Sequence, residues 1–366
     1  MFSTRFRIAM GVSVTLALAS LSIAPAYAES AKSQIVNREL DSKNFRNNKI
    51  GTSSVRKMTI YLPSGYAESA KRFPAIYFFA SPFDKTYRSI FDEHDAQGVF
   101  DQAIAAGVIG KFILVCVDMT TLLGSSWYVN SPVTGNWEDF VVQELVPYID
   151  ANFKTLANRD SRGIAGVFMG GHGAIRLAMK HSEVFGSVYG MHPVGTGSGV
   201  RIMDSLPNWG ILANAKSLDD VKQDGYTLIF TGIFQAHLAN PSKPPLFIDL
   251  AAHRDGDQLV IDPQLTERLR NSFFLESLIP QYAAKLKSLR GFKFDWARSD
   301  GNFDHVYSNQ AYTHKLNEFG IAHEAEEYNG SWGEQTWGRD GRVYTEVLPF
   351  FQRHLVFAEN NDQKTK

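Results

Sequence analysis

Short apolar runs recur along the chain from residue 55 onward and alternate with stretches of helical spacing. Strands are predicted at 58–62, 75–79, 112–117, 163–166, 187–191, 226–230, 292–296 and 324–328, and those at 75–79 and 112–117 are apolar at every position. Helices are predicted where apolar residues recur at helical spacing, at 89–106, 138–149, 170–180, 281–289, 308–319 and 343–357. Such alternation is typical of a parallel sheet buried on both faces. We therefore predict an α/β fold with a mostly parallel central sheet and helices on both faces.

The alternation is interrupted between residues 195 and 275, where segments rich in Gly and Pro, such as 240–245, separate the apolar runs. We interpret 195–275 as a cap or a long, loop-rich insertion over the carboxyl end of the sheet, and not as a separate domain. The predicted domain spans 55–357 and includes this insertion. A polar lead-in at 29–54 precedes it, and the tail at 358–366 is predicted to be disordered.

The first residues have the pattern of an export signal. Arg5 and Arg7 precede an apolar stretch at 8–23, and Ala26-Tyr27-Ala28 resembles a signal-peptidase site. We expect cleavage after Ala28 and a periplasmic or secreted protein. The alternative is a membrane anchor, but the stretch is short for a helix that spans a bilayer, which needs about 20 residues. No later segment is long and apolar enough to span one.

Composition excludes several classes of protein. The chain has 37 Lys and Arg against 38 Asp and Glu, so its net charge of −1 argues against a nucleic-acid binder. Its single cysteine, Cys116, excludes an intrachain disulfide and a zinc–thiolate cluster. With 366 residues that are 44% hydrophobic, the chain can bury a sizeable core. An enzyme or a ligand-binding protein fits these limits.

Residues 159–174 read RDSRGIAGVFMGGHGA, which resembles the strand, sharp turn and helix that carry the nucleophile in the α/β-hydrolase fold. More narrowly, the chain resembles the esterase family that includes feruloyl esterases, S-formylglutathione hydrolases and the mycolyltransferase antigens. Other segments with this resemblance are 58–66, 127–132, 135–140, 320–324 and 326–328. The resemblance implies an α/β-hydrolase fold over residues 55–357 and a catalytic serine, histidine and acid.

The sequence departs from the family at three positions of this machinery. In the G-x-S-x-G signature, Phe168 stands where the nucleophilic serine is expected, and phenylalanine has no nucleophilic atom. Ser331 stands where the family has its histidine. One oxyanion donor, the N–H of Met169, is retained, whereas the second falls either on Ser81 or on Pro82, which has no N–H to donate.

Three residues are candidates for the remaining polar chemistry. Asp300 follows the strand at 292–296, as the family's acid does, and Asp304 is the weaker candidate for that role. His192 follows the strand at 187–191, at the sheet edge where such folds bind ligands, or is a hydrogen-bonded structural residue. His305 follows Asp304 and could reach the pocket. We name Asp300, His192 and His305 as the candidate catalytic residues.

Aromatic residues border the pocket that the resemblance implies. Trp127, Tyr128, Trp332 and Trp337 are the predicted pocket-lining residues, although ordinary burial also explains aromatic side chains in such loops. Histidine spacing of the kind H-x-H or H-x-x-x-H is missing from the sequence, so we expect no metal and no other cofactor.

The first functional hypothesis is an exported esterase-family protein that has lost Ser–His hydrolysis. Its pocket would bind a small molecule with a flat or apolar part, or would run non-hydrolytic chemistry. The second is an active ester hydrolase with relocated groups, in which Ser331 or Ser81 is the nucleophile and His192 or His305 the base. The third is a non-enzymatic protein that binds a partner or a carbohydrate. The pattern predicts neither the identity of the ligand nor the oligomeric state.

Overall fold

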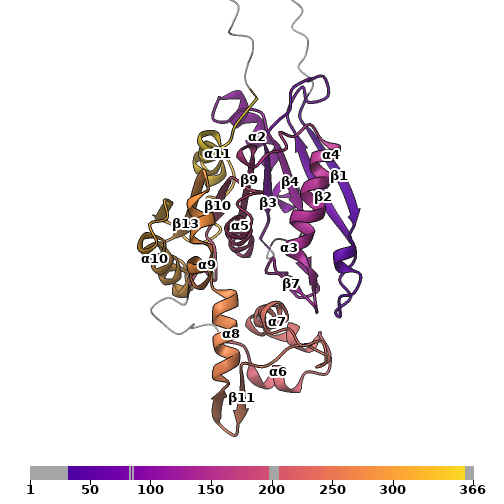
Figure 1. Ribbon diagram of the computed structural model, residues 1–366, viewed down its shortest axis with the longest axis vertical. Helices are drawn as coiled ribbons and strands as arrows, with labels where there is room; N and C mark the ends of the chain where they lie inside the picture. The colour runs from indigo at the N-terminus through magenta and orange to yellow at the C-terminus, as the bar shows by residue number, and fades with distance from the viewer. Residues whose placement is uncertain (1–31, 82–83, 85, 198–205, 359–366) are drawn as a thin grey trace, which may run out of the picture.

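The computed structural model describes residues 32–81, 84, 86–197 and 206–358. An eight-stranded sheet with the order β1-β2-β4-β3-β9-β10-β13-β14 forms its centre (Figure 1). These strands are β1 (Gln34–Asp41), β2 (Val55–Leu62), β3 (Ala75–Phe79), β4 (Ile113–Val117), β9 (Arg162–Val167), β10 (Ser187–Met191), β13 (Gly291–Ala297) and β14 (Glu324–Tyr328). β2 pairs antiparallel with β1 and β4, and the other neighbours are parallel. The predicted mostly parallel sheet is confirmed.

Helices cover both faces of the sheet and also lie beyond one of its ends. They are α1 (Ser89–Asp92), α2 (Ala96–Ala105), α3 (Trp137–Asp139), α4 (Val146–Asn152), α5 (Met169–Lys180), α6 (Trp209–Asn214), α7 (Gly225–His237), α8 (Pro263–Phe273), α9 (Leu275–Lys287), α10 (Phe303–Glu318) and α11 (Leu348–His354). The π-helical segments are η2 (Phe140–Leu145) and η5 (Val343–Val347), and the 3₁₀ turns are η1 (Lys43–Phe45), η3 (Arg159–Ser161) and η4 (Asp220–Gln223). The short strand pairs are β5 (Thr120–Thr121) with β6 (Gly124–Ser125), β7 (Asn130–Ser131) with β8 (Gly135–Asn136), and β11 (Ala252–Asp255) with β12 (Gln258–Ile261).

Two apolar clusters lie on opposite faces of the sheet, which explains why β3 and β4 are apolar at every position. In β3, Tyr77 and Phe79 pack on the face covered by η2, α4, α5, α9 and α10. Ile76 and Phe78, which alternate with them, pack on the face covered by α2, η5 and α11. Successive side chains of a strand point to opposite faces, so a strand buried on both sides needs an unbroken apolar run.

The described part of the insertion forms a compact cap rather than loops. It contains α6, α7, α8 and the β11–β12 hairpin, which project beyond one end of the sheet in Figure 1. The cap has an apolar cluster of its own, in which Phe230 and Phe234 of α7 pack with Phe273 of α8. Phe168 and Met169, at the end of β9, belong to the same cluster. The cap is therefore packed against the carboxyl end of the sheet, although the predicted loop-rich character is wrong.

Two further expectations about local structure need correction. The predicted strand at 226–230 is part of helix α7, in which Asp224 caps the first turn through the backbone N–H of Thr227. Because α7 is apolar on nearly all sides, periodicity could not distinguish it from a buried strand. The lead-in at 29–54 is polar, but from Gln34 to Asp41 it forms β1, which pairs along its whole length with β2. An edge strand that is largely exposed has no apolar face for a sequence pattern to show.

Other predicted elements are found with shifted boundaries. The helix expected at 89–106 is divided into α1 and α2 by Asp95, which adopts a left-handed conformation and caps α2. The signal segment at 1–28 and the tail from residue 359 lie outside the described residues. Across the described ranges, no helix has both the length and the apolar character needed to cross a bilayer.

Candidate functional site

The turn between β9 and α5 keeps the backbone of a nucleophile elbow with a phenylalanine at its apex. Phe168 has φ 55° and ψ −118°, a region that non-glycine residues rarely occupy. The turn is tight because glycines surround it: a Cβ on Gly166 would overlap the carbonyl of Gly170, and one on Gly170 would overlap the carbonyl of Phe79. The local fold therefore presents residue 168 above the sheet, as the sequence pattern implied.

The ring of Phe168 is buried between two other rings. Only 2% of the residue is exposed. The ring of Trp332 meets it edge to face, with centroids 4.2 Å apart and planes at 83°. The imidazole of His192 lies on another side, with its centroid 5.1 Å away. Residue 168 thus contributes apolar surface to the site, and its neighbours are arranged around a ring instead of a hydroxyl.

Asp300 joins two histidines beside this ring. Its Oδ2 accepts hydrogen bonds from His192 Nε2 at 2.8 Å and from His305 Nδ1 at 2.7 Å, and its Oδ1 accepts the backbone N–H of Asn302 at 2.8 Å. Asp300 is 1% exposed. Burial by itself would raise the pKa of this carboxyl, but the donors from His192, His305 and Asn302 outweigh burial and lower it. Asp300 is therefore ionised.

The two histidines differ in what their second nitrogen does. Nδ1 of His192 accepts the backbone N–H of Ala297 at 3.1 Å, so its ring proton is on Nε2 and points at Asp300. Both nitrogens of His192 are thereby committed to protein groups. His305 donates through Nδ1, and among the described residues its Nε2 contacts the side-chain amide of Asn302, at 3.3 Å. The available imidazole nitrogen of the cluster is therefore Nε2 of His305.

The position of the ring proton on His192 also affects whether the cluster can bind a metal. One ligand atom from each of His192, Asp300 and His305 lies within 4.8 Å of the others, a spacing that a metal ion could use. A metal-bound imidazole nitrogen must be free of its proton. Nδ1 of His192 accepts the backbone N–H of Ala297 and therefore carries no proton. The ring proton of His192 is thus on Nε2, the nitrogen that faces Asp300. The donor set fits hydrogen bonds to a carboxylate better than a metal.

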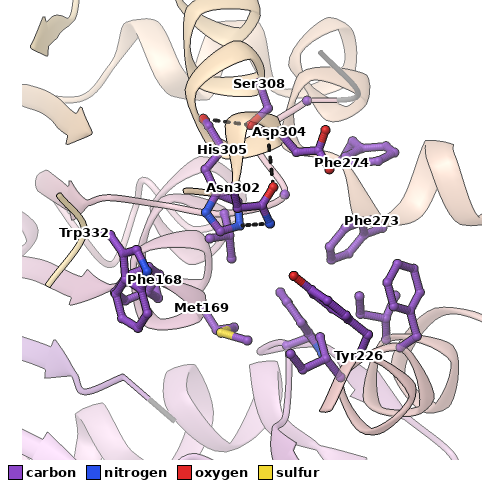
Figure 2. Close-up of a pocket in the computed structure, with 17 residues that line it drawn as sticks. Phe168, Met169, Tyr226, Phe273, Phe274, Asn302, Asp304, His305, Ser308 and Trp332 are labelled. Carbon is purple, nitrogen blue, oxygen red and sulfur yellow. Dashed lines mark hydrogen bonds between the residues drawn. The ribbon is translucent and has the colours of Figure 1, made fainter. Parts of the chain in front are cut away.

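A cavity of about 220 Å³ lies above Phe168, between the cap and the first turn of α10. Its polar wall comes from Asn302, Asp304, His305 and Ser308, which lie together in Figure 2. The remaining walls are mostly apolar and come from the elbow and the cap: Trp127, Phe168, Met169, Val194, Gly195, Gly197, Tyr226, Ile229, Phe230, Ile233, Phe273, Phe274 and Trp332. A mostly apolar cavity with a few converging polar groups is typical of a small-molecule site.

The predicted aromatic residues divide between this cavity and the core. Trp127 and Trp332 line the cavity. Tyr128 does not: its ring packs on Phe79 with centroids 4.7 Å apart and lies over Gly173. Trp337 does not either, because its ring packs against Phe78 on the other side of the sheet. For Tyr128 and Trp337, the alternative of ordinary burial was the better interpretation.

The serines proposed as relocated nucleophiles do not line the cavity. Ser81 lines a different cavity, with Asp84 and Asp118, and Pro82 lies outside the described residues. The backbone N–H of Ser331 bonds to the carboxylate of Glu334. Met169, whose backbone N–H was the expected oxyanion donor, begins α5 and lines the cavity.

Asn302 and Ser308 are part of the site although the sequence pattern did not indicate them. Ser308 donates from Oγ to the carbonyl of His305 at 3.1 Å, one turn away on α10. Asn302 caps α10 and contacts Nε2 of His305. The position of Asn302 two residues after Asp300, before a helix, was the available signal, because asparagine is a preferred N-cap.

Curated relatives match a limited part of this chain. Residues 51–226 match the model of the Esterase family. An esterase of Mycobacterium tuberculosis is 34% identical over 136 residues, which are 36% of this chain and 27% of the relative. An endo-1,4-beta-xylanase/feruloyl esterase of Xylanibacter ruminicola is 29% identical over 139 residues, 37% of this chain and 19% of the relative. The matches thus span about a quarter of the length of these relatives or less.

Solved structures match nearly the whole chain. A ferulic acid esterase superposes with a TM-score of 0.59 at 19% identity and covers 89% of this chain and 100% of its own. An S-formylglutathione hydrolase from Agrobacterium tumefaciens superposes with a TM-score of 0.58 at 13% identity, over 89% of this chain and 97% of its own. At these identities the likeness concerns the fold. The chain therefore has the α/β-hydrolase fold, and its residues 51–226 match the model of the Esterase family.

Proposed function

We propose that this protein binds a small molecule with a flat or apolar part in the cavity above Phe168, and that it does not hydrolyse esters through a serine. The observation that carries the proposal is the elbow itself. Its strained backbone is kept, but the residue that it presents is a buried ring in contact with Trp332. A phenyl ring has no lone pair to attack a carbonyl, and it adds flat apolar surface to the floor of the cavity.

The alternative of an active hydrolase needs a serine within reach of a base. Among the described residues, the serine that lines the cavity is Ser308, whose hydroxyl donates to the carbonyl of His305 and accepts from Thr196. His192 cannot act as its base while both ring nitrogens are engaged. The third alternative, a binding protein without catalysis, shares the same cavity and differs only in what His305 does there.

Methyl ferulate is a suitable probe, because it is flat and carries a carboxylic ester. We expect it to quench the fluorescence of the two cavity tryptophans, Trp127 and Trp332, and to be recovered unhydrolysed. Ile229→Trp, on the cavity wall, should fill the cavity and abolish binding. Leu228→Trp is the matched control, since Leu228 is its neighbour on α7 and is not among the lining residues. Ferulate release, or stoichiometric labelling of a serine by a fluorophosphonate, would overturn the proposal.

We also propose that the protein is exported with cleavage after Ala28. The support is the order of Arg5 and Arg7, the apolar stretch at 8–23 and the small residues before Glu29. Expression of the full chain in a bacterium with separate analysis of periplasm and medium tests this. A mature N-terminus at Glu29 is expected, and an intact N-terminus in the cytoplasm would contradict it.

A further inference from the structure

The polar wall of the cavity contains an acid–imidazole pair, Asp300 and His305, and the imidazole of this pair lines the cavity. His305 is held by Asp300 through Nδ1 at 2.7 Å. Its side chain remains 24% accessible, whereas those of His192 and Asp300 are 3% and 0% accessible. Figure 2 shows His305 beside Asn302 on the same side of the cavity as Ser308. Of the three members of the cluster, His305 is therefore the one that a bound molecule can touch.

From this geometry we propose that His305 is a general base that removes a proton from a bound carbon acid with a flat, apolar body. The inference rests on the proposed function, since it needs the cavity above Phe168 to hold the molecule. An ionised carboxylate behind an imidazole keeps the ring proton on Nδ1, leaves the lone pair on Nε2, and stabilises the imidazolium that forms. In serine hydrolases the imidazole of such a pair contacts the nucleophilic serine. Here the imidazole lines a mostly apolar cavity instead.

The arrangement suits a carbon acid for two reasons. The surrounding walls include Phe168, Met169 and Phe274, so the base is presented to a region with few competing hydrogen-bond partners. The contact between Nε2 and Asn302 is long, at 3.3 Å, and a bound molecule can replace it at little cost. A base that is close to a bound C–H bond needs no nucleophile on the elbow, which agrees with the loss of serine at position 168.

The step balances without a co-reactant. The C–H bond of the substrate breaks, its proton forms a bond to Nε2 of His305, and the electron pair moves into the conjugated system or expels a leaving group from the same molecule. The imidazolium then returns the proton to the product or to water. Asp300 acts as a positioning residue, because it touches His305 and not the reacting atoms.

The benzisoxazole elimination is a direct test of such a base. In 5-nitrobenzisoxazole, removal of the ring C–H proton forms a nitrile, breaks the N–O bond and releases a coloured phenolate, and the molecule is flat and apolar. We expect the mature protein to accelerate this reaction, and His305→Gln to lower kcat by about 100-fold, which is at the low end of what a general base contributes. Added imidazole should partly restore the rate of His305→Ala.

Two variants separate catalysis from folding. Asp300→Asn should lower kcat with little change in KM, because an amide donating to Nδ1 would move the ring proton to Nε2. His314→Gln is the matched control, since His314 is exposed on the same helix α10, and its rate should equal that of the unaltered protein.

The outcomes are distinct for the two proposals. Binding of the probe without turnover, or turnover that His305→Gln leaves unchanged, would overturn the role of His305 and leave the ligand cavity standing. Ile229→Trp should abolish both binding and turnover. A probe that neither quenches the cavity tryptophans nor reacts would count against both proposals.

Discussion

The ring of Phe168 and the ring of Trp332 meet edge to face, with centroids 4.2 Å apart. Phe168 lies at the apex of the elbow after β9, and Trp332 lies in the loop after β14. In a working hydrolase the elbow and the loop after the last strand carry the serine and the histidine that share a hydrogen bond. Here an aromatic contact joins the same two loops. The elbow and the loop after β14 therefore still meet, but through apolar surface.

The single change Phe168→Ser is expected to give no esterase activity. The imidazole in contact with the ring of residue 168 is that of His192, and both of its nitrogens are engaged by Ala297 and Asp300. A serine hydroxyl without a base stays protonated and is a weak nucleophile. Hydrolysis of p-nitrophenyl acetate should be equal in Phe168→Ser and the matched control Phe168→Ala. Turnover by the serine variant alone would show that a base already points at the elbow.

Adding a histidine is expected to help only if the histidine reaches the elbow. In the double variant Phe168→Ser with Trp332→His, the new imidazole occupies the position of a ring that already touches residue 168. In Phe168→Ser with Ser331→His, it starts from a residue whose backbone is bound to Glu334. Both lack an acid, because Asp300 is already shared by His192 and His305. We expect weak activity at most, and more from the first double variant; the reverse order would place Ser331 nearer the site than the Trp332 contact indicates.

Glycine is expected to be better tolerated than alanine at position 168. Either change removes a buried ring, at a cost of about 3–5 kcal/mol. With φ 55° and ψ −118°, however, residue 168 is in a region that glycine occupies freely and alanine does not. Phe168→Gly should therefore be more stable than Phe168→Ala by about 1 kcal/mol, the opposite of the order in a helix. Urea unfolding of the two variants measures this, and equal or reversed stability would show that the elbow relaxes when the ring is removed.

The sequence predicted the sheet well because its central strands are buried on both faces. β3, β4 and β10 were found within a residue of their ends, since a short unbroken apolar run between predicted helices is typical of a fully buried strand. Helix α7 was missed by the same criterion, because it is also apolar throughout and a short apolar run does not distinguish a helix from a strand. β1 was missed because its burial comes from pairing with β2 rather than from its own side chains.

The sequence predicted only those residues of the candidate site that follow closely after a strand of the sheet. Asp300 and His305 follow β13 closely, so their place at the carboxyl edge could be inferred from the sequence. Which histidine is available could not, because that depends on the backbone N–H of Ala297, a group that every residue but proline has. The role of Trp332 also depends on how two loops meet, which no local pattern encodes.

The stability of the protein is expected to fall as pH decreases below 6.5, in part through His172. This side chain is buried against Trp127 and Phe273. Burial, together with the charge of Arg176, lowers its pKa from 6.5 to about 3, although its hydrogen bond to the carbonyl of Val194 opposes this. Between these values the unfolded chain binds a proton that the folded chain does not. The contribution of His172 to the free energy of unfolding is therefore fully present above pH 6.5. It is lost as the pH falls toward 3, by roughly 1.4 kcal/mol per pH unit.

The measurement is the free energy of unfolding at several pH values between 4 and 7. His172→Phe should reduce the slope by about one proton, and a slope remains because burial also lowers the pKa of His237. His314→Gln, an exposed histidine, should leave the slope unchanged. An unaltered slope in His172→Phe would mean that His172 is protonated in the folded protein.

His192 is expected to stabilise the fold and not to bind the ligand directly. It joins β10 to the loop after β13 by accepting from the backbone of Ala297 and donating to Asp300. His192→Ala would leave the N–H of Ala297 without that partner and remove a hydrogen bond to an ionised carboxylate, which together should cost about 3 kcal/mol. His192→Asn should lose less, because asparagine tolerates the left-handed backbone found here, with φ 44°, and can still accept one bond. At a temperature where both variants are folded, methyl ferulate should bind within a few-fold of the unaltered protein. A variant with native stability that no longer binds would instead place His192 in the binding site, and the distinction between the two histidines drawn from their second nitrogens would be lost.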